Sequence, residues 1–247
     1  MLCNPAHLIL VIIFTTKTYA RIIVSVTMDA LIQQLRPHGT MRVVKKGSNV
    51  FFQGEIPRRV MIVREGVIRA YTITSTGEER VVKLHGKGDI FPLSWALGET
   101  SNTLFYYDAV SDARLLSVGK DEFLDVLAND TAALTSMLYF MANEYTALLL
   151  RINGLEQSRA LEKIGFTLYY LLFRYSDEKA PGLFTINMKM SQLMIANLVG
   201  LTRESTTKNL KILKDKGIIH YSGSLYTIDK LKLENFLGED SFRDLSL

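Results

Sequence analysis

Residues 190–217 read MSQLMIANLVGLTRESTTKNLKILKDKG, an amphipathic pattern with a break at its centre. Ser191 is a good helix N-cap, and Gly200 allows a sharp turn before Thr202, which can cap a second helix. The small side chain of Ala196, four residues before Gly200, permits close helix contact. The spacing therefore predicts a helix-turn-helix.

The second of these helices carries its basic residues on one side. Leu210 and Leu213 face inward, and the opposite side holds Arg203, Glu204, Thr207, Lys208 and Lys211. Residues 182–223 contain six basic and two acidic residues, so this segment alone matches the net charge of +4 of the whole chain. Since a helix-turn-helix places its second helix in the DNA major groove, the basic face favours DNA binding over an ordinary solvated lysine face. The following GIIHYSGSLYTI predicts a small hairpin, or wing.

The first half of the chain has a different period. Between residues 43 and 118 apolar residues alternate with a period near two, and glycines punctuate the pattern, as at Glu65-Gly66 and Thr76-Gly77. Short strands at regular intervals without intervening helices predict an antiparallel barrel or jelly roll. Such a roll can enclose a small ligand or be filled by its own side chains.

A heptad pattern follows the roll. Steps of four and three residues connect Leu134, Leu138, Met141, Tyr145, Leu148, Ile152 and Leu155. The seam fits a dimeric coiled coil and also a helix buried in its own domain. Because Leu149 and Leu150 widen the apolar face, we expect this helix to contact both the roll and a second subunit. Asn153-Gly154 weakens it and predicts a hinge. A second helix is expected over residues 158–175, ending in the polar run SDEKAPG.

Composition limits the chemistry. The 247 residues suffice for two ordinary domains, and the single cysteine, Cys3, excludes disulfides and cysteine-ligated clusters within one chain. The four histidines show no ligand spacing, so we expect no metal and no cofactor. The apolar run over residues 8–14 is too short for a membrane span and lacks the preceding basic residues of a signal peptide. We expect a cytoplasmic protein without a membrane partner.

These patterns predict an α+β fold with five parts. Residues 1–27 are interpreted as a non-native or disordered extension, because Met28 opens an amphipathic segment; a genuine arm or a weak anchor are the alternatives. The other expected parts are a β-roll of effector type over 28–128, a dimerisation helix with hinge over 129–157, a winged helix-turn-helix over 158–238 and a tail over 239–247.

The order of these parts, with GDIF at residues 88–91 and VGLTRESTTKNLKIL at residues 199–213, resembles the Crp-Fnr superfamily of bacterial transcription regulators. The resemblance implies base reading by Arg203 and Glu204, joined by Thr207 and Lys208. Arginine suits guanine and glutamate suits cytosine. Lys208 departs from the commoner arginine and lacks its planar fork. Phosphate contacts are expected from Lys189, Ser191, Thr202 and Lys211.

The resemblance also implies a ligand site in the roll, but its phosphate-binding residues are absent. Cyclic-nucleotide-binding relatives carry a glutamate and an arginine where this chain has Leu93 and residues 103–105, TLF. Since burying a phosphate without a cation is costly, we expect no cyclic AMP binding. Either no effector exists, or an apolar small molecule lies in a pocket lined by Trp95, Thr103, Phe105 and Tyr145. His85 is the only haem-ligand candidate in the roll.

The function expected is that of a homodimeric regulator of palindromic double-stranded DNA, contacting RNA polymerase if it is an activator. Two alternatives were weighed against it. A cupin-like metal enzyme needs clustered histidine and glutamate ligands, and only His85 lies in the roll. A dimeric interaction module without DNA leaves the basic helix-turn-helix segment unexplained. We therefore expect no enzymatic activity.

Overall fold

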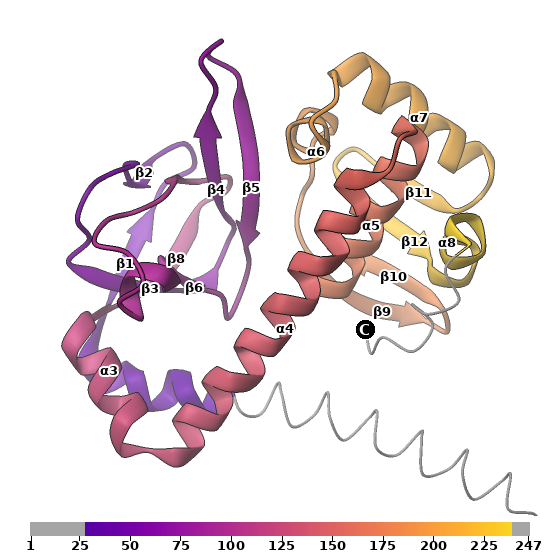
Figure 1. Cartoon of the computed structure of the whole chain (residues 1–247). Coiled ribbons are helices and arrows are strands. Elements are labelled where there is room, and N and C mark those ends of the chain that lie inside the picture. The colour runs from indigo at the N-terminus through magenta and orange to yellow at the C-terminus, as the bar shows by residue number, and fades with distance from the viewer. Residues whose placement is uncertain (1–27, 239–247) are drawn as a thin grey trace, which may run out of the picture.

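The computed structural model describes residues 28–238, so the expected extension 1–27 and the tail 239–247 lie outside the described residues. Figure 1 shows two halves joined by a long helix, α4. Within residues 28–238 no helix combines the length and the apolar character needed to cross a membrane.

The first half consists mainly of strands. Residues 28–35 are helical and lead into a short 3-10 helix, Arg36–His38. The strands and helices that follow are β1 (Gly39–Val44), β2 (Asn49–Phe51), β3 (Arg59–Glu65), β4 (Ile68–Ile73), β5 (Glu79–His85), β6 (Ile90–Phe91), α2 (Leu93–Ala96), β7 (Tyr106–Ala109), β8 (Ala113–Gly119) and α3 (Lys120–Asn129).

These strands form two four-stranded antiparallel sheets, in the orders β1-β8-β3-β6 and β2-β7-β4-β5. The roll predicted from the alternating pattern is therefore confirmed. The four central residues of β3 are all apolar because both faces of the strand are buried. Met61 and Val63 pack between the two sheets, while Val60 and Ile62 lie on the other face in the cluster that contains Phe123. Gly66 has a φ of +83°, and a Cβ there would lie 2.3 Å from the carbonyl oxygen of Asp112, so only glycine fits this turn.

One expectation about the roll is wrong. The strands are not free of intervening helices, because α2 lies between β6 and β7. Trp95 and Ala96 of this single helical turn are buried. They belong to the apolar cluster between the outer face of the sheet β1-β8-β3-β6 and the helices α3 and α4. Four residues are too few to show a helical period, so the pattern could not predict α2.

The predicted long helix is confirmed as α4 (Thr131–Glu156), and α5 (Ala160–Tyr175) packs along it. Asp130 caps α4 by accepting hydrogen bonds from the amides of Ala132 and Ala133 at 2.7 and 3.1 Å. The helix continues through Asn153-Gly154 without a break. Gly154 is buried, and a Cβ there would lie 2.9 Å from Cβ of Phe166, so its small size lets α5 approach. A hinge at this position stays a prediction.

The second half combines a sheet with helices. Its elements after α5 are β9 (Ser176–Ala180), β10 (Leu183–Ile186), α6 (Gln192–Val199), α7 (Arg203–Asp215), β11 (Ile219–Ser222), β12 (Leu225–Asp229) and α8 (Lys230–Leu237). The sheet order is β11-β12-β10-β9. The polar run after residue 175 is thus an edge strand and not a helix end. The three residues after Ser176 are exposed and charged, which is typical of edge strands and gives no apolar alternation.

One apolar cluster spans the two halves. Val81 and Leu84 of β5 belong to the same buried cluster as Ala147 and Leu150 of α4 and the interior of the second half. Helix α6 also contacts β5 directly. The roll therefore packs against the helix-turn-helix as well as against α4.

Candidate nucleic-acid interface

Helices α6 and α7 form the predicted helix-turn-helix. The hydroxyl of Ser191 accepts from the amide of Met194 at 3.1 Å, and that of Thr202 accepts from the amide of Ser205 at 3.2 Å. Gly200 ends α6 in the left-handed conformation, with φ 78° and ψ 33°. Each of the three residues has the structural role that the sequence predicts.

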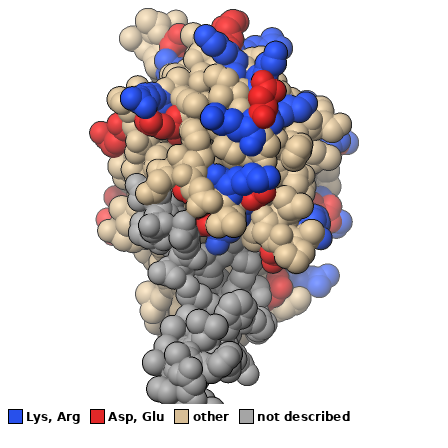
Figure 2. Space-filling model, turned by 90° about the vertical axis from the view of Figure 1, so that its right-hand side faces the viewer, with Lys and Arg blue, Asp and Glu red and all other residues tan. Residues whose placement is uncertain are grey.

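Helix α7 divides into a buried and an exposed face. Thr206, Leu210 and Leu213 are fully buried. The predicted base-reading residues and Lys211 are exposed on the other face: Arg203, Glu204, Thr207, Lys208 and Lys211. Figure 2 shows lysine and arginine side chains gathered over the upper part of one side of the molecule, where Figure 1 places α7. The exposed face of α7 is thus available to a polyanion.

Thr207 has a contact that the sequence did not predict. Its hydroxyl lies 2.6 Å from Oε1 of Gln192 and donates there or to the carbonyl of Arg203 at 2.9 Å. Gln192 is the first residue of α6, and it lies with Ser191, Arg203 and the wing residues 223–224 around a hollow of about 510 Å³. Gln192 is therefore a further candidate contact. In the sequence, the only indication of a DNA contact by Gln192 is its position directly after the N-cap residue Ser191.

The lysines of the segment differ in their surroundings. Lys189, which precedes α6, and Lys211, on α7, are exposed, as predicted for phosphate contacts. Lys214 lies at the end of α7 with its ammonium 4.7 Å from the centre of the Tyr221 ring, so it packs on the wing. Ser191 and Thr202 lie at the N-termini of α6 and α7, where free amides favour phosphate.

The heptad seam is exposed along the whole of α4. Its seven side chains have exposed fractions from 38% at Leu155 to 63% at Tyr145. The opposite side of the helix is buried against the roll and α5 through Ala133, Met137, Phe140, Ala147 and Leu150. A soluble monomer rarely exposes so long an apolar stripe.

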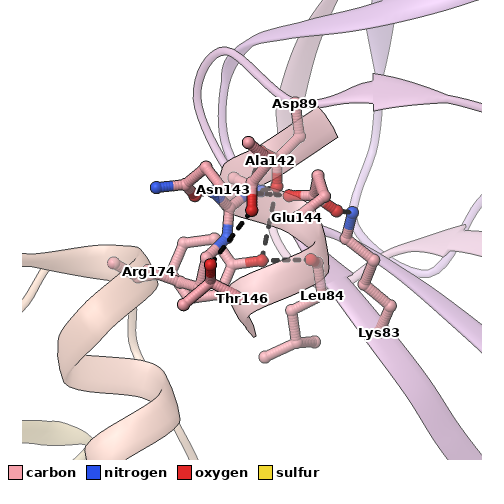
Figure 3. A network of polar contacts seen from close by, with 10 residues as sticks. Lys83, Leu84, Asp89, Ala142, Asn143, Glu144, Thr146 and Arg174 are labelled. Carbon is pink, nitrogen blue, oxygen red and sulfur yellow. Dashed lines mark hydrogen bonds and ion pairs between the residues drawn. The ribbon is translucent and has the colours of Figure 1, made fainter. Parts of the chain in front are cut away.

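A buried polar network connects the two halves beside this helix (Figure 3). Arg174 of α5 pairs with Asp89 of the roll at 2.5 Å and also with Glu144 of α4, which in turn pairs with Lys83 of β5. Arg151 of α4 adds a second connection, because its Nη2 donates to the carbonyls of Val81 at 2.6 Å and Leu198 at 3.0 Å. The roll, the long helix and the helix-turn-helix are thus held by charged side chains that the sequence did not single out.

The residues of the predicted effector pocket lie apart in this single chain, and an effector in the roll stays a prediction. Trp95 is buried among helices on the outer face of the roll, Phe105 packs between the sheets, and Tyr145 is exposed on α4. The hydroxyl of Thr103 donates to the carbonyl of Phe52. These four residues lie in separate environments. The sequence could not predict this, because residue spacing does not show which face of the roll each side chain occupies.

His85 is completely enclosed. Its ring packs 5.0 Å from that of Phe91 and 5.8 Å from that of Tyr107, measured between centroids. Burial, together with Lys83 and Arg174, holds the pKa of His85 well below its usual value. The part of the chain that the structure describes contains no group of three or more histidine, cysteine, aspartate or glutamate residues placed to hold a metal ion.

Sequence comparisons agree with both halves. Residues 41–130 match the family described as cyclic nucleotide-binding domain, and residues 163–236 match the Crp-like helix-turn-helix domain. The regulatory protein HlyX of Actinobacillus pleuropneumoniae is 25% identical over 83% of this chain and 81% of its own length. The nitrogen fixation regulation protein FixK of Azorhizobium caulinodans is 25% identical over 75% of this chain and 73% of its own.

Solved structures share the fold. FixK2 from Bradyrhizobium japonicum matches with a TM-score of 0.66 and 21% identity, over 80% of this chain and 96% of that one. A CooA mutant from Carboxydothermus hydrogenoformans matches with a TM-score of 0.66 and 20% identity, over 81% and 88% of the two chains.

A β-roll followed by a long helix and a winged helix-turn-helix defines a class of DNA-binding transcription regulators, and the sequence relatives named above are regulators by name. The chain belongs to the Crp-Fnr family within that class.

Proposed function

We propose that this regulator binds a palindromic DNA site as a homodimer. The exposed apolar stripe of α4 carries the proposal, because a second copy of the same stripe would cover it by isologous contact. Two α7 helices would then enter successive major grooves, about 34–36 Å apart. Arg203, Glu204 and Lys208 would read bases, and the helix N-termini with Lys189 and Lys211 would contact phosphates.

The proposal includes no enzymatic activity and no cyclic AMP response. The positions where the resemblance implies a glutamate and an arginine hold Leu93 and residues 103–105, and the hydroxyl of Thr103 is engaged with a backbone carbonyl. A cyclic phosphate in the roll would lack its cation. The protein would act in the cytoplasm, where DNA and, for an activator, RNA polymerase are its partners.

Selection of random duplex DNA by the purified full chain, without effector, tests the proposal. The selected duplex is then titrated by fluorescence anisotropy at fixed salt, and sedimentation gives the stoichiometry. We expect a palindrome bound by two chains. Binding of one chain, or equal binding to all duplexes with and without added cell extract, would contradict it. Calorimetry with cyclic AMP supplies the separate test, and micromolar affinity there would contradict the effector part.

A further inference from the structure

A cleft of about 980 Å³ lies between the roll and the second half. One wall consists of turns of the roll and the end of β3, including residues 46–47, 64–67 and 86–87, and the other wall holds the end of α5 and the start of α6. Ligand pockets have volumes of roughly 300–1,000 Å³ and occur preferentially at such domain junctions. None of the four residues of the predicted effector pocket lines this cleft.

Cations dominate the polar lining. Four basic residues of the lining have no carboxylate within ion-pair distance among residues 28–238: Lys46, Arg64, Lys87 and Lys189. Lys46 and Lys87 lie in two turns of the roll, Arg64 lies near the end of β3, and Lys189 lies in the segment before α6. Like charges that converge on one space repel each other, and a bound anion removes that cost.

The carboxylates of the lining do not neutralise these cations. Asp108 is held by Arg69 at 2.7 Å, and Glu65 pairs with Arg114 at 3.2 Å. In addition, Nη1 of Arg64 is buried without a hydrogen-bond partner in the described part of the chain. A buried charged donor without an acceptor is costly, so an acceptor brought to Arg64 would relieve that cost.

The remaining lining has apolar character. Val67, Tyr175, Met188 and Met194 contribute side chains from both walls. An anionic group with an apolar body therefore matches the cleft better than a bare ion does. The volume of about 980 Å³ also lies in the range of small-molecule pockets.

We propose that this cleft binds a small organic molecule with a terminal phosphate group, a class that does not include the cyclic diester cyclic AMP. Because both halves contribute to the lining, the bound anion favours the arrangement of roll and helix-turn-helix seen in this structure. Such a ligand would be a candidate effector of the regulator. This regulatory consequence rests on the proposed function, whereas the binding of the anion to the cleft does not.

Isothermal titration calorimetry of the full chain tests the site with inorganic phosphate, pyrophosphate and phenyl phosphate. The test variant is Arg64→Gln/Lys87→Gln. The control, Lys45→Gln/Arg80→Gln, removes the same charge from two roll cations that do not line the cleft. We expect wild type and control to bind pyrophosphate and phenyl phosphate more tightly than phosphate, and the test variant to bind them about tenfold more weakly or worse.

Two outcomes would overturn the proposal. If both double variants bind the probes equally well, the anions bind outside the cleft. If wild type binds none of the probes, the cleft is not an anion site. If no probe binds but the test variant has weaker DNA affinity and a smaller salt slope than the control, the cleft follows the DNA backbone instead. Because the calorimetry involves no DNA, failure to select a palindrome would not affect the anion result. Failure of the probes to bind would likewise not affect the result of the DNA selection.

Discussion

Nη2 of Arg174 lies 2.5 Å from Oδ1 of Asp89, and both side chains are more than nine-tenths buried. Asp89 also accepts from the amide of Gly86 at 2.9 Å, so it fixes a turn of the roll, while Arg174 belongs to the helix that supports the helix-turn-helix. The pair is thus a direct ionic connection between the two halves. A buried pair of this kind is sensitive to the loss of one partner.

Replacement of Arg174 with methionine is expected to lower the free energy of unfolding by about 3–5 kcal/mol, because Asp89 is left as a buried charge without its ion partner and Glu144 keeps only its pair with Lys83. Urea denaturation measures the change. Lys45→Met is the control, since its ion pair with Asp112 is exposed and its loss should alter stability little. If the two variants lose similar amounts of unfolding free energy, the buried pair contributes no more to stability than the exposed pair does.

Removal of Arg203 separates base reading from charge. Arg203→Ala is expected to weaken the selected site by about 1–3 kcal/mol and to relax the preference at one base pair. Lys211→Ala should weaken all duplexes alike and reduce the salt slope by about one unit. Anisotropy titrations against the selected site and its single-base variants distinguish them. A uniform loss for Arg203→Ala would reassign that residue to the phosphates.

Charge in the α4 stripe should prevent dimerisation. Leu138, the second residue of the stripe, is 60% exposed, and Leu138→Glu would bury a carboxylate in the proposed dimer interface. Sedimentation velocity is expected to show a monomer with an unchanged circular dichroism spectrum. Leu231→Glu is the matched control, because Leu231 is 58% exposed on α8, away from the stripe. A dimeric Leu138→Glu variant would exclude this face as the interface.

His85 makes stability depend on pH. Its pKa is lowered below 6.5 in the folded protein by burial, so the unfolded chain takes up a proton below that pH while the folded chain does not. The free energy of unfolding therefore falls with decreasing pH below about 6.5, with a slope of up to about 1.4 kcal/mol per pH unit from this group.

Denaturation of wild type and His85→Leu at several pH values between about 7.5 and 5 measures this linkage. The variant is expected to lose part of the slope, whatever its absolute stability. His220→Gln, which changes an exposed histidine of the wing, should keep the wild-type slope. If His85→Leu keeps the full slope, the acid sensitivity comes from other groups.

Local pattern accounts for much of the fold. The caps Ser191 and Thr202, the left-handed Gly200 and the apolar Leu210 and Leu213 act within a few residues of chain, so the sequence alone predicts the helix-turn-helix. The alternation of the roll and the heptads of α4 are likewise readable, because each period follows from the geometry of one element.

Only the tertiary structure decides which residues meet between elements. Arg174 and Asp89 are 85 positions apart, and no spacing rule relates them. The same holds for the cations of the cleft and for the separation of Trp95, Phe105 and Tyr145, which the family resemblance had suggested as one pocket. Hydrogen bonds within a turn depend on nearby residues, whereas side-chain contacts across the halves depend on how whole sheets and helices pack. For this protein, the sequence determined the DNA-binding element, and the packing of the two halves decided what joins them.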